Sequence, residues 1–243
     1  MAVRDVFIVE DNKKFYRKES FHFFFAYDSE LKKQIPQENR ERLHGSFHKK
    51  YPALSVLEVS TASDSKLGRM LSPFNLQMQL NNGFITNVES VYQASKVFEN
   101  GNQFEDLLYA SPLRAKQDER LRTNGNLSCF RLEGKEYPLI PKTFFYNYVY
   151  CKALSQDLLN HDIIRKKMQQ YDAFTDIRFY SLNGEINCQA RACALAVSLM
   201  KQNLLEEAVH FPQQFLRIAY QKRQNEFEKP KDSVAKEINL FEL

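Results

Sequence analysis

Several residue types and motifs are scarce or missing in this chain of 243 residues. It contains no tryptophan and only seven glycines, and neither a GxGxxG nor a GxxxxGKS/T phosphate loop occurs. A GxSxG motif is also missing, so we do not expect a serine nucleophile of the α/β-hydrolase type. The four cysteines form no CxxC pair and predict reduced, partly buried thiols instead of a disulfide framework or zinc site. They are Cys129, Cys151, Cys188 and Cys193.

Long apolar runs are missing too. No stretch of about 18 uninterrupted apolar residues predicts a transmembrane helix, and the N-terminal residues lack the apolar core of a signal peptide. We therefore expect a cytoplasmic protein without a membrane partner. His44 and His48 are four residues apart, but the intervening Gly-Ser-Phe argues against a helix there, so no metal site is predicted.

The net charge of +4 is small for a chain of this length. Affinity for nucleic acid would therefore have to come from local basic patches, such as residues 13–18 or 48–50. Short runs of this kind are more often ordinary solvated surface.

The remaining composition indicates one large domain over residues 1–243. Aromatic and β-branched runs, VFIVED, ESFHFFFAY and SVLEVSTAS, predict short strands in a strand-rich part at about 1–70. A helical body is expected at about 71–221, followed by a charged tail at about 222–243. The fold class is thus a single compact, predominantly helical α+β domain with a few short N-terminal strands.

Helical patterns follow one another through the body of the chain. Ser111 followed by Pro112 is typical of a helix cap and first turn. The segment around residues 192–199 is so low in polarity that it predicts a buried core helix. The expected helical segments lie at 88–99, 104–110, 111–122, 141–159, 161–171 and 187–213.

The stretch VESVYQASKVFENG at residues 88–101 allows two interpretations. On a helix, Glu89, Gln93 and Lys96 would fall within about 60° of one another, since i, i+4 and i+7 share a face. Such a polar stripe is usually the solvated face of an amphipathic helix. It could instead be the polar side of a functional site, and this segment alone favours the solvated face.

The order of five motifs resembles the NADAR family, and most of all its branch paired with DarT-type DNA ADP-ribosyltransferase toxins. The motifs are LSPFNLQ, VESVYQASKVFENG, ASPLRAKQDERLR, YDAFTDI and NCQARACALAVSL, over roughly residues 55–205. The most specific is ExxxQxxK at Glu89, Gln93 and Lys96, followed by SPxxAK, which ends at Lys116. The resemblance implies removal of ADP-ribose from guanine bases in DNA. More distant relatives are implicated in cleaving N-glycosidic bonds of riboflavin intermediates.

The resemblance also implies roles for these side chains. A deprotonated Lys96 amine could attack C1 of the opened ribose and form a Schiff base, if its pKa is lowered. Glu89 could take a proton from Lys96 or from water, or stabilise an oxocarbenium-like sugar. Gln93 could bind a ribose hydroxyl between them. This chemistry needs neither a metal nor another cofactor.

The other motifs supply further candidates. Asp176 is expected to be the third catalytic or ribose-binding carboxylate, in preference to Asp172, which would then cap a turn. Arg191 could hold a diphosphate through its forked guanidinium, or it could be an ordinary helix-surface arginine. The remaining substrate-binding candidates are Asn187, near a helix start, and Phe74 and Asn75 of LSPFN. Phe74 could equally belong to the core.

Single-stranded DNA is the expected partner, because the guanine amino group is occupied in a duplex. A cognate DarT-type toxin is a second possible partner. An N-glycosidase acting on a small ribosylated metabolite and a non-catalytic protein that binds ADP-ribose or sequesters the toxin remain open as alternatives. The aromatic and basic residues expected to hold DNA are Phe21, His22, Phe23, Tyr27, Lys32, Lys33 and His44.

Overall fold

The computed structural model describes residues 1–28, 33–34, 36–178 and 187–220. Its largest sheet contains β1 (Ala2–Val9), β2 (Tyr16–Phe23), β5 (Val56–Glu58) and β11 (Ala173–Thr175). The strand order is β2-β1-β11-β5. β1 pairs antiparallel with β2 and β11, whereas β11 and β5 are parallel. The end of β11 therefore lies beside the end of β5, although about 117 residues separate them.

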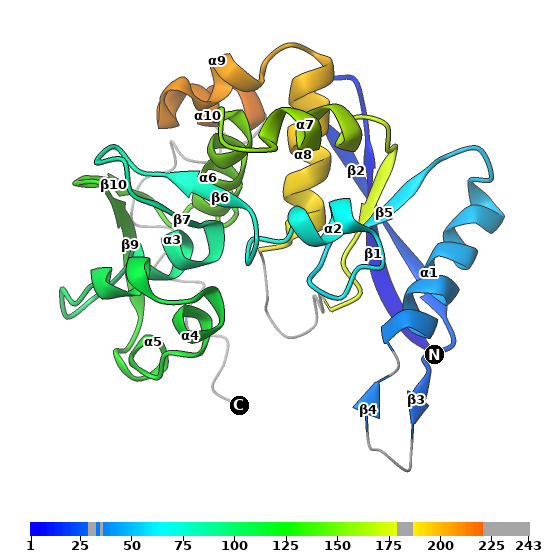
Figure 1. The fold of residues 1–243 in the computed structure, drawn as a ribbon, viewed down its shortest axis with the longest axis horizontal. Helices are drawn as coiled ribbons and strands as arrows, with labels where there is room; N and C mark the ends of the chain where they lie inside the picture. The colour runs from blue at the N-terminus through cyan, green and yellow to red at the C-terminus, as the bar shows by residue number, and fades with distance from the viewer. Residues whose placement is uncertain (29–32, 35, 179–186, 221–243) are drawn as a thin grey trace, which may run out of the picture.

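Side chains of β1 alternate between two cores, one on each face of the sheet. Val6 and Ile8 belong to the core shared with α1 (Pro36–Lys50). Phe7 points the other way, into the core built around α8 (Gln189–Lys201). In Figure 1 the sheet runs between these two helices.

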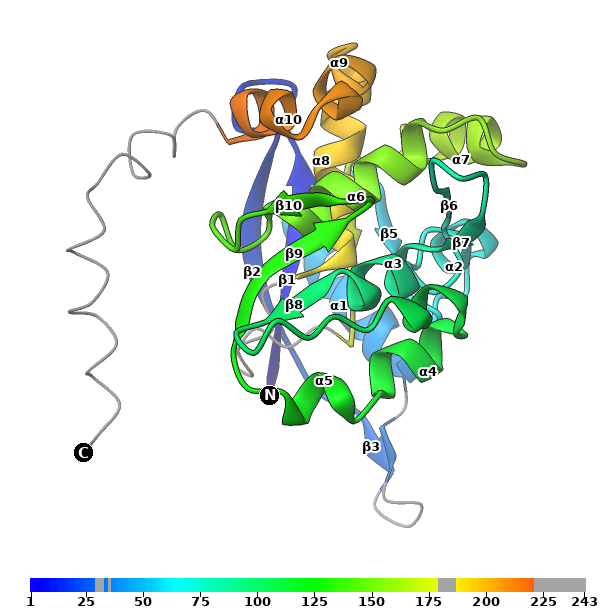
Figure 2. The same ribbon diagram turned by 90° about the vertical axis from the view of Figure 1, so that its left-hand side faces the viewer.

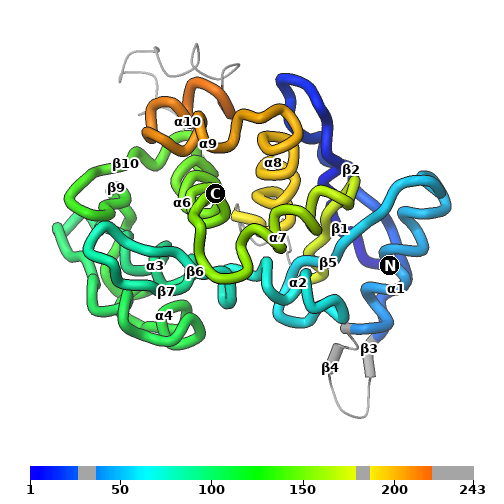
Figure 3. The backbone as a smooth tube through the Cα atoms, turned by 45° about the horizontal axis from the view of Figure 1, so that its top comes forward, coloured from blue at the N-terminus to red at the C-terminus, as the bar shows by residue number. Residues whose placement is uncertain are grey.

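α8 is the central helix of the molecule. Residues 192–199 are all buried, which confirms the core helix that low polarity predicts. α8 packs against α6 (Phe144–Ser155) and α9 (Leu205–His210), and Figure 3 shows α6 and α8 between the two outer parts of the chain. The other helices near them are α2 (Lys66–Met70), α7 (His161–Met168) and α10 (Pro212–Ala219).

A second part of the chain surrounds α3 (Val88–Ala94), which packs against α6. Figure 2 shows this part in front of the four-stranded sheet, with β9 curving along it. Its elements are β6 (Gln77–Gln79), β7 (Ile85–Asn87), β8 (Lys96–Phe98), η1 (Glu105–Tyr109), α4 (Pro112–Gln117), α5 (Arg120–Thr123), β9 (Leu127–Leu132) and β10 (Lys135–Tyr137). β10, β9 and β8 form a three-stranded sheet in that order, and β6 pairs with β7. The short strands β3 (Tyr27–Asp28) and β4 (Lys33–Gln34) also pair with each other.

The mixture of helices and separate sheets agrees with the α+β class. Strands are not confined to the first quarter, however, because β6 to β11 follow later in the chain. The argument against a helix at His44 and His48 is also wrong, since α1 includes both. Leu43 and Phe47 of α1 are fully buried, and their packing outweighs the roughly 1 kcal/mol by which the exposed Gly45 disfavours a helix.

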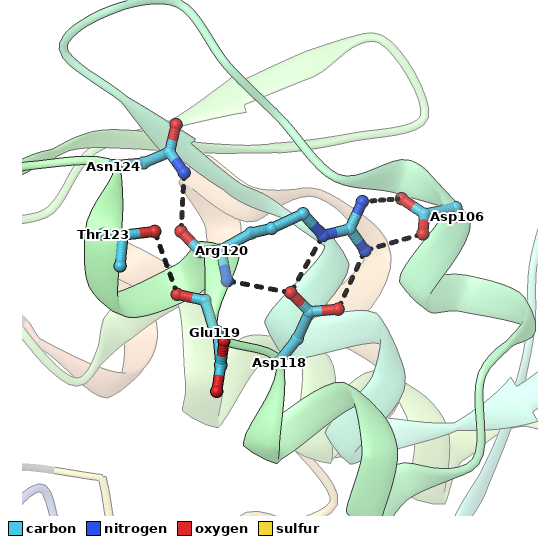
Figure 4. A network of polar contacts seen from close by, with 6 residues as sticks. All are labelled: Asp106, Asp118, Glu119, Arg120, Thr123 and Asn124. Atoms are coloured by element: carbon cyan, nitrogen blue, oxygen red, sulfur yellow. Dashed lines mark hydrogen bonds and ion pairs between the residues drawn. The ribbon is translucent and has the colours of Figure 1, made fainter.

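The helix expected at 111–122 begins as predicted and then breaks. Ser111 caps α4 through its hydroxyl, which accepts from the Arg114 N–H, and Pro112 occupies the first turn. Asp118 leaves the helical conformation and accepts hydrogen bonds from the backbone and guanidinium of Arg120. Arg120 also binds Asp106 of η1 at 2.7 Å, as Figure 4 shows. These ion pairs hold the α4–α5 turn against η1.

Among the described residues, no helix is long and apolar enough to cross a membrane. The charged tail predicted from residue 222 onward lies outside the described residues.

Candidate functional site

The LSPFN motif forms a turn that holds the start of α3. The Glu89 N–H donates to the Pro73 carbonyl at 2.9 Å, and the Val88 N–H donates to Leu76 at 3.0 Å. Phe74 is half-buried, and the Lys116 ammonium lies 5.6 Å from the centre of its ring. LSPFN and SPxxAK, two separate sequence motifs, therefore meet beside Glu89.

Glu89 and Gln93 form a buried pair on α3. Glu89 is 5% exposed and Gln93 is 6% exposed, which contradicts the solvated-face interpretation of this stripe. The Gln93 Nε2 donates to Glu89 Oε1 at 2.8 Å. Gln93 Oε1 is buried and has no hydrogen-bond partner within the described part of the chain, so it can accept a hydrogen bond from a ligand.

Lys96 does not lie on the same helix as Glu89, and the prediction of a helix to residue 99 is wrong. Ser95 ends α3, because its hydroxyl donates to the Val91 carbonyl at 2.7 Å and its own carbonyl accepts from Arg131 of β9 at 2.7 Å. The chain then extends into β8, where Lys96 pairs with Phe130. The helix-to-strand junction, and not an i, i+7 relation, brings Lys96 close to Glu89.

The Lys96 amine lies in surroundings that favour its neutral form. Burial is the main cause of a lowered pKa, and the nearby Lys116 adds to it, whereas the Glu89 carboxylate opposes the shift. The amine stands 5.2 Å from the centre of the Tyr92 ring. A lowered pKa increases the fraction of Lys96 that is neutral at a given pH, and a neutral amine is the form that can attack a carbon atom.

Asn187 reaches Lys96 through Tyr92. Its Nδ2 donates to the Tyr92 hydroxyl at 2.7 Å, and the Lys96 amine lies over the ring of the same tyrosine. The Asn187 Oδ1 is a second buried acceptor without a partner among the described residues. Asn187 directly precedes Cys188, the N-cap of α8.

Asp176 follows the end of β11 and is 8% exposed. Its two carboxylate oxygens accept from the Gln189 Nε2 at 2.8 Å and from the Arg178 N–H at 3.0 Å. Tyr146 of α6 links it electrostatically to Glu89, because burial and both carboxylates raise the pKa of the tyrosine. The segments around residues 89, 176 and 187 therefore share one polar region.

Tyr146 and Tyr92 belong to a cluster of aromatic rings beside Glu89 that the sequence patterns did not reveal. Tyr92 meets Tyr146 edge-on with ring centres 5.4 Å apart, and Phe130 stacks on Phe145 at 4.4 Å. The clue in the sequence was the aromatic run FFYNYVY of α6, which looks like ordinary core.

Three other predicted residues have contacts with parts of the chain other than α3. Arg191 is half-buried with its guanidinium 5.4 Å from the centre of the Phe7 ring on β1. Asn75 is exposed and donates to the Arg69 carbonyl at 2.7 Å. Asp172 accepts from the Ser55 hydroxyl at 2.8 Å, which agrees with a structural role for it.

Glu58 is the most prominent acidic group that sequence reasoning missed. It lies at the end of β5, is 3% exposed and accepts hydrogen bonds from Ser60, Thr175 and Ile177. Burial, and then the neighbouring Asp176 carboxylate, raise its pKa to about 8. No motif or spacing marks it, since it stands within the apolar run SVLEVS.

Three of the seven residues expected to hold DNA are not available for that role. Phe21 and Phe23 are buried between the sheet and α1, and His44 binds the Thr175 hydroxyl at 3.0 Å. His22 is exposed, and Lys32 lies outside the described residues. Alternation along β2 explains this outcome, because every second residue of the strand, here Phe21 and Phe23, points into the core.

Two hollows on the surface of the described residues are lined by neither Lys96 nor Asp176. One lies beside α4, lined in part by Leu113 and Arg114, and the other lies between β2 and the last turn of α1. Within the described residues, no group of three or more His, Cys, Asp or Glu side chains could hold a metal ion.

Comparison with known proteins gives one family. Residues 2–229 match the family described as DarT1-associated NADAR antitoxin. A search of curated proteins gave no match. The family match extends beyond the motifs at residues 55–205 and includes the N-terminal sheet and α1.

Proposed function

The chain belongs to the DarT1-associated NADAR antitoxin family, and from this membership we propose that it hydrolyses the bond between ADP-ribose and guanine in DNA. Such a reaction would reverse the modification made by a DarT-type toxin. The substrate would be ADP-ribosylated single-stranded DNA, and the products would be free ADP-ribose and unmodified guanine.

The proposal rests on a half-buried lysine with a lowered pKa, which lies within electrostatic range of a buried glutamate. A surface ion pair would keep both groups charged and hydrated, and it would contribute little energy. Here the Lys96 amine is largely shielded from water and faces the electrostatic influence of Glu89 and Lys116. A protein that only bound ADP-ribose would have no need of this arrangement.

The proposed reaction proceeds through a ring-opened ribose and a Schiff base on Lys96. Opening of the ribose ring protonates its ring oxygen and leaves an imine between C1 of the sugar and the guanine amino nitrogen. The neutral Lys96 amine adds to C1, and guanine departs with a proton, which leaves a Schiff base on Lys96. Water then adds to C1, and release of ADP-ribose regenerates the lysine. Glu89 would carry the protons in these steps.

Substrate contacts follow from the free acceptors and charges. Gln93 Oε1 and Asn187 Oδ1 each suit a hydroxyl or N–H donor, such as those of ribose or guanine, better than a phosphate. Phe74 with the adjacent Lys116 offers a ring face beside a cation for an adenosine or a phosphate. Asp176 would bind ribose or stabilise positive charge on it. Asn75 and Arg191 would act only at the ends of an extended ligand.

The test is release of ADP-ribose from an ADP-ribosylated single-stranded oligonucleotide. We expect turnover on the oligonucleotide and slower turnover on the same sequence in a duplex. An ADP-ribosylated guanine nucleotide serves as the small substrate. Equal rates on nucleotide and oligonucleotide would favour a metabolite glycosidase, and binding of ADP-ribose without release would contradict an enzyme.

A matched control separates hydrolysis from toxin sequestration. The purified chain is added after the toxin has been removed from the modified DNA. Release of ADP-ribose under these conditions requires catalysis by this chain, whereas a sequestering protein would protect DNA only while the toxin is present.

A further inference from the structure

Glu58 holds both residues that flank Asp176. The Thr175 hydroxyl donates to Glu58 Oε2 at 2.8 Å, and the Ile177 N–H donates to Oε1 at 3.0 Å. The Ser60 hydroxyl adds a third donor at 2.9 Å. The backbone on both sides of Asp176 is therefore held by the buried carboxyl group of Glu58 on the neighbouring strand β5.

Two neighbouring carboxyl groups in a buried place favour sharing one proton, because two negative charges repel each other where water cannot screen them. Glu58 is the more deeply buried of the two, at 3% exposed against 8% for Asp176. Both oxygens of Asp176 accept hydrogen bonds from N–H donors, which favours its charged form. Glu58 also accepts three hydrogen bonds, which oppose its protonation, but burial and the neighbouring Asp176 carboxylate outweigh them and raise its pKa to about 8. Below about pH 8 the shared proton is therefore assigned to Glu58.

Several other titratable groups around Glu58 and Asp176 have pKa values shifted away from pH 8. His44 of α1 contacts Thr175 and has its pKa lowered to about 4, mainly by burial and further by His48 and Arg40, whereas Asp64 opposes this. On the α8 side, burial raises the pKa of Cys193 to about 12. The pKa values of Cys188 and Tyr146 are raised as well.

We propose that Glu58 is a positioning residue for Asp176. It fixes the turn on both sides of Asp176 and holds the proton that the two carboxyl groups share, so that Asp176 faces the sugar as a carboxylate. This role rests on the proposed function, because Asp176 is taken there to contact ribose.

The test compares Glu58→Gln with Glu58→Ala over pH 6 to 9.5. In the unchanged protein, kcat for ADP-ribose release should fall above about pH 8, where Glu58 loses its proton beside Asp176. Glu58→Gln resembles the protonated acid, and we expect kcat within about threefold of the original at pH 7 without the alkaline fall. Glu58→Ala should lose about 10- to 100-fold in kcat at every pH, because the turn loses its support.

A companion variant is Thr175→Val, which keeps the shape but removes one donor to Glu58, together with the hydroxyl that His44 contacts. It should move the alkaline fall to higher pH, because the charged form of Glu58 is then less stabilised. An alkaline fall in Glu58→Gln equal to that of the unchanged protein would overturn the proposal, even if Glu58→Ala failed to fold.

A second readout does not depend on activity. Carbon-13 NMR of the carboxyl groups should show one signal with a midpoint near pH 8 that is missing in Glu58→Gln. If the unchanged chain releases no ADP-ribose, the proposed function fails while this titration still decides where the proton resides. A Glu58 signal that titrates below pH 6 would contradict the proposal.

Discussion

Two glutamates are buried to nearly the same extent in this molecule, at 5% exposed for Glu89 and 3% for Glu58. Glu89 has an amide and a lysine as neighbours, whereas Glu58 has hydroxyl groups, a backbone N–H and a second carboxyl group. Burial alone does not determine the state of a carboxyl group, because the neighbours decide whether its charge is compensated. Glu89 is thus suited to exchange protons with an amine, and Glu58 is suited to keep one.

The largest expected effect on hydrolysis concerns Lys96, because a neighbouring lysine is what distinguishes Glu89 from Glu58. Lys96→Ala should lower hydrolysis by more than the roughly 10²–10⁴-fold that removal of an acid-base group costs. Lys96→Arg should fail as well, because a guanidinium stays protonated. Borohydride should trap a covalent adduct on Lys96 during turnover, which mass spectrometry of the digested protein can locate.

The control for this prediction is Lys166→Ala, which removes an exposed lysine on α7 that is paired with Asp162. Hydrolysis by this variant should not change. Near-normal turnover of Lys96→Ala would show that Lys96 is not the nucleophile. Loss of activity without a trapped adduct would instead assign Lys96 to stabilising charge during direct attack by water.

Glu89→Gln should have the next largest effect, a decrease in kcat of about 10²–10⁴-fold with little change in affinity for ADP-ribose. The substitution keeps the shape but removes the group that can take a proton from Lys96. Rapid-quench measurements should show both slower formation and slower breakdown of the adduct. If Glu89→Gln and Glu58→Gln had equal effects at pH 7, the distinction between the two glutamates would be lost.

A smaller effect concerns stability and pH. Glu58 binds a proton in the folded state up to about pH 8, whereas the unfolded chain releases it near 4.5, so stability falls as the pH rises between these values. His44 has the opposite effect, but only between about pH 4 and 6.5. From pH 6.5 to 8, Glu58 should therefore lower the free energy of unfolding by about 2 kcal/mol. Urea denaturation of the unchanged protein and of Glu58→Gln measures this difference, and equal slopes with pH would contradict it.

The smallest effect is expected for Tyr92→Phe. The ring stays beside Lys96, but Asn187 Nδ2 loses the hydroxyl to which it donates, at a cost of about 1 kcal/mol. Tyr109→Phe is the matched control, because Tyr109 is 69% exposed and its loss of a hydroxyl should change stability by less than about 0.5 kcal/mol. Equal stabilities of the two variants in urea would mean that the Asn187 contact contributes nothing.

The sequence predicted the Glu89 side of the site much better than the Glu58 side. Glu89, Gln93 and Lys96 lie close in sequence within one motif, so local spacing brought them together even though the helix ends at Ala94. The end itself depends on the contact of Ser95 with Arg131 of β9, a residue 36 positions later. Local propensity carries no information about such a partner.

Glu58 and Asp176 meet only because β5 and β11 are adjacent and parallel. That pairing joins residues about 117 positions apart, and a strand register cannot be deduced from one sequence without the tertiary fold. The short strands near the start, the cap at Ser111 and the buried α8 were predictable, because each depends on composition or on residues next to one another.

The junction at Ser95 limits which insertions and substitutions this segment can tolerate during evolution. Lys96 is the first residue of a strand, and successive strand residues point to opposite faces. A single residue inserted after Ser95 would turn the amine away from Glu89, while the helix and the sheet could both persist. The segment from α3 to β8 should therefore accept many replacements of side chains but almost no change in length. Libraries that vary its length by one residue would yield folded, inactive proteins.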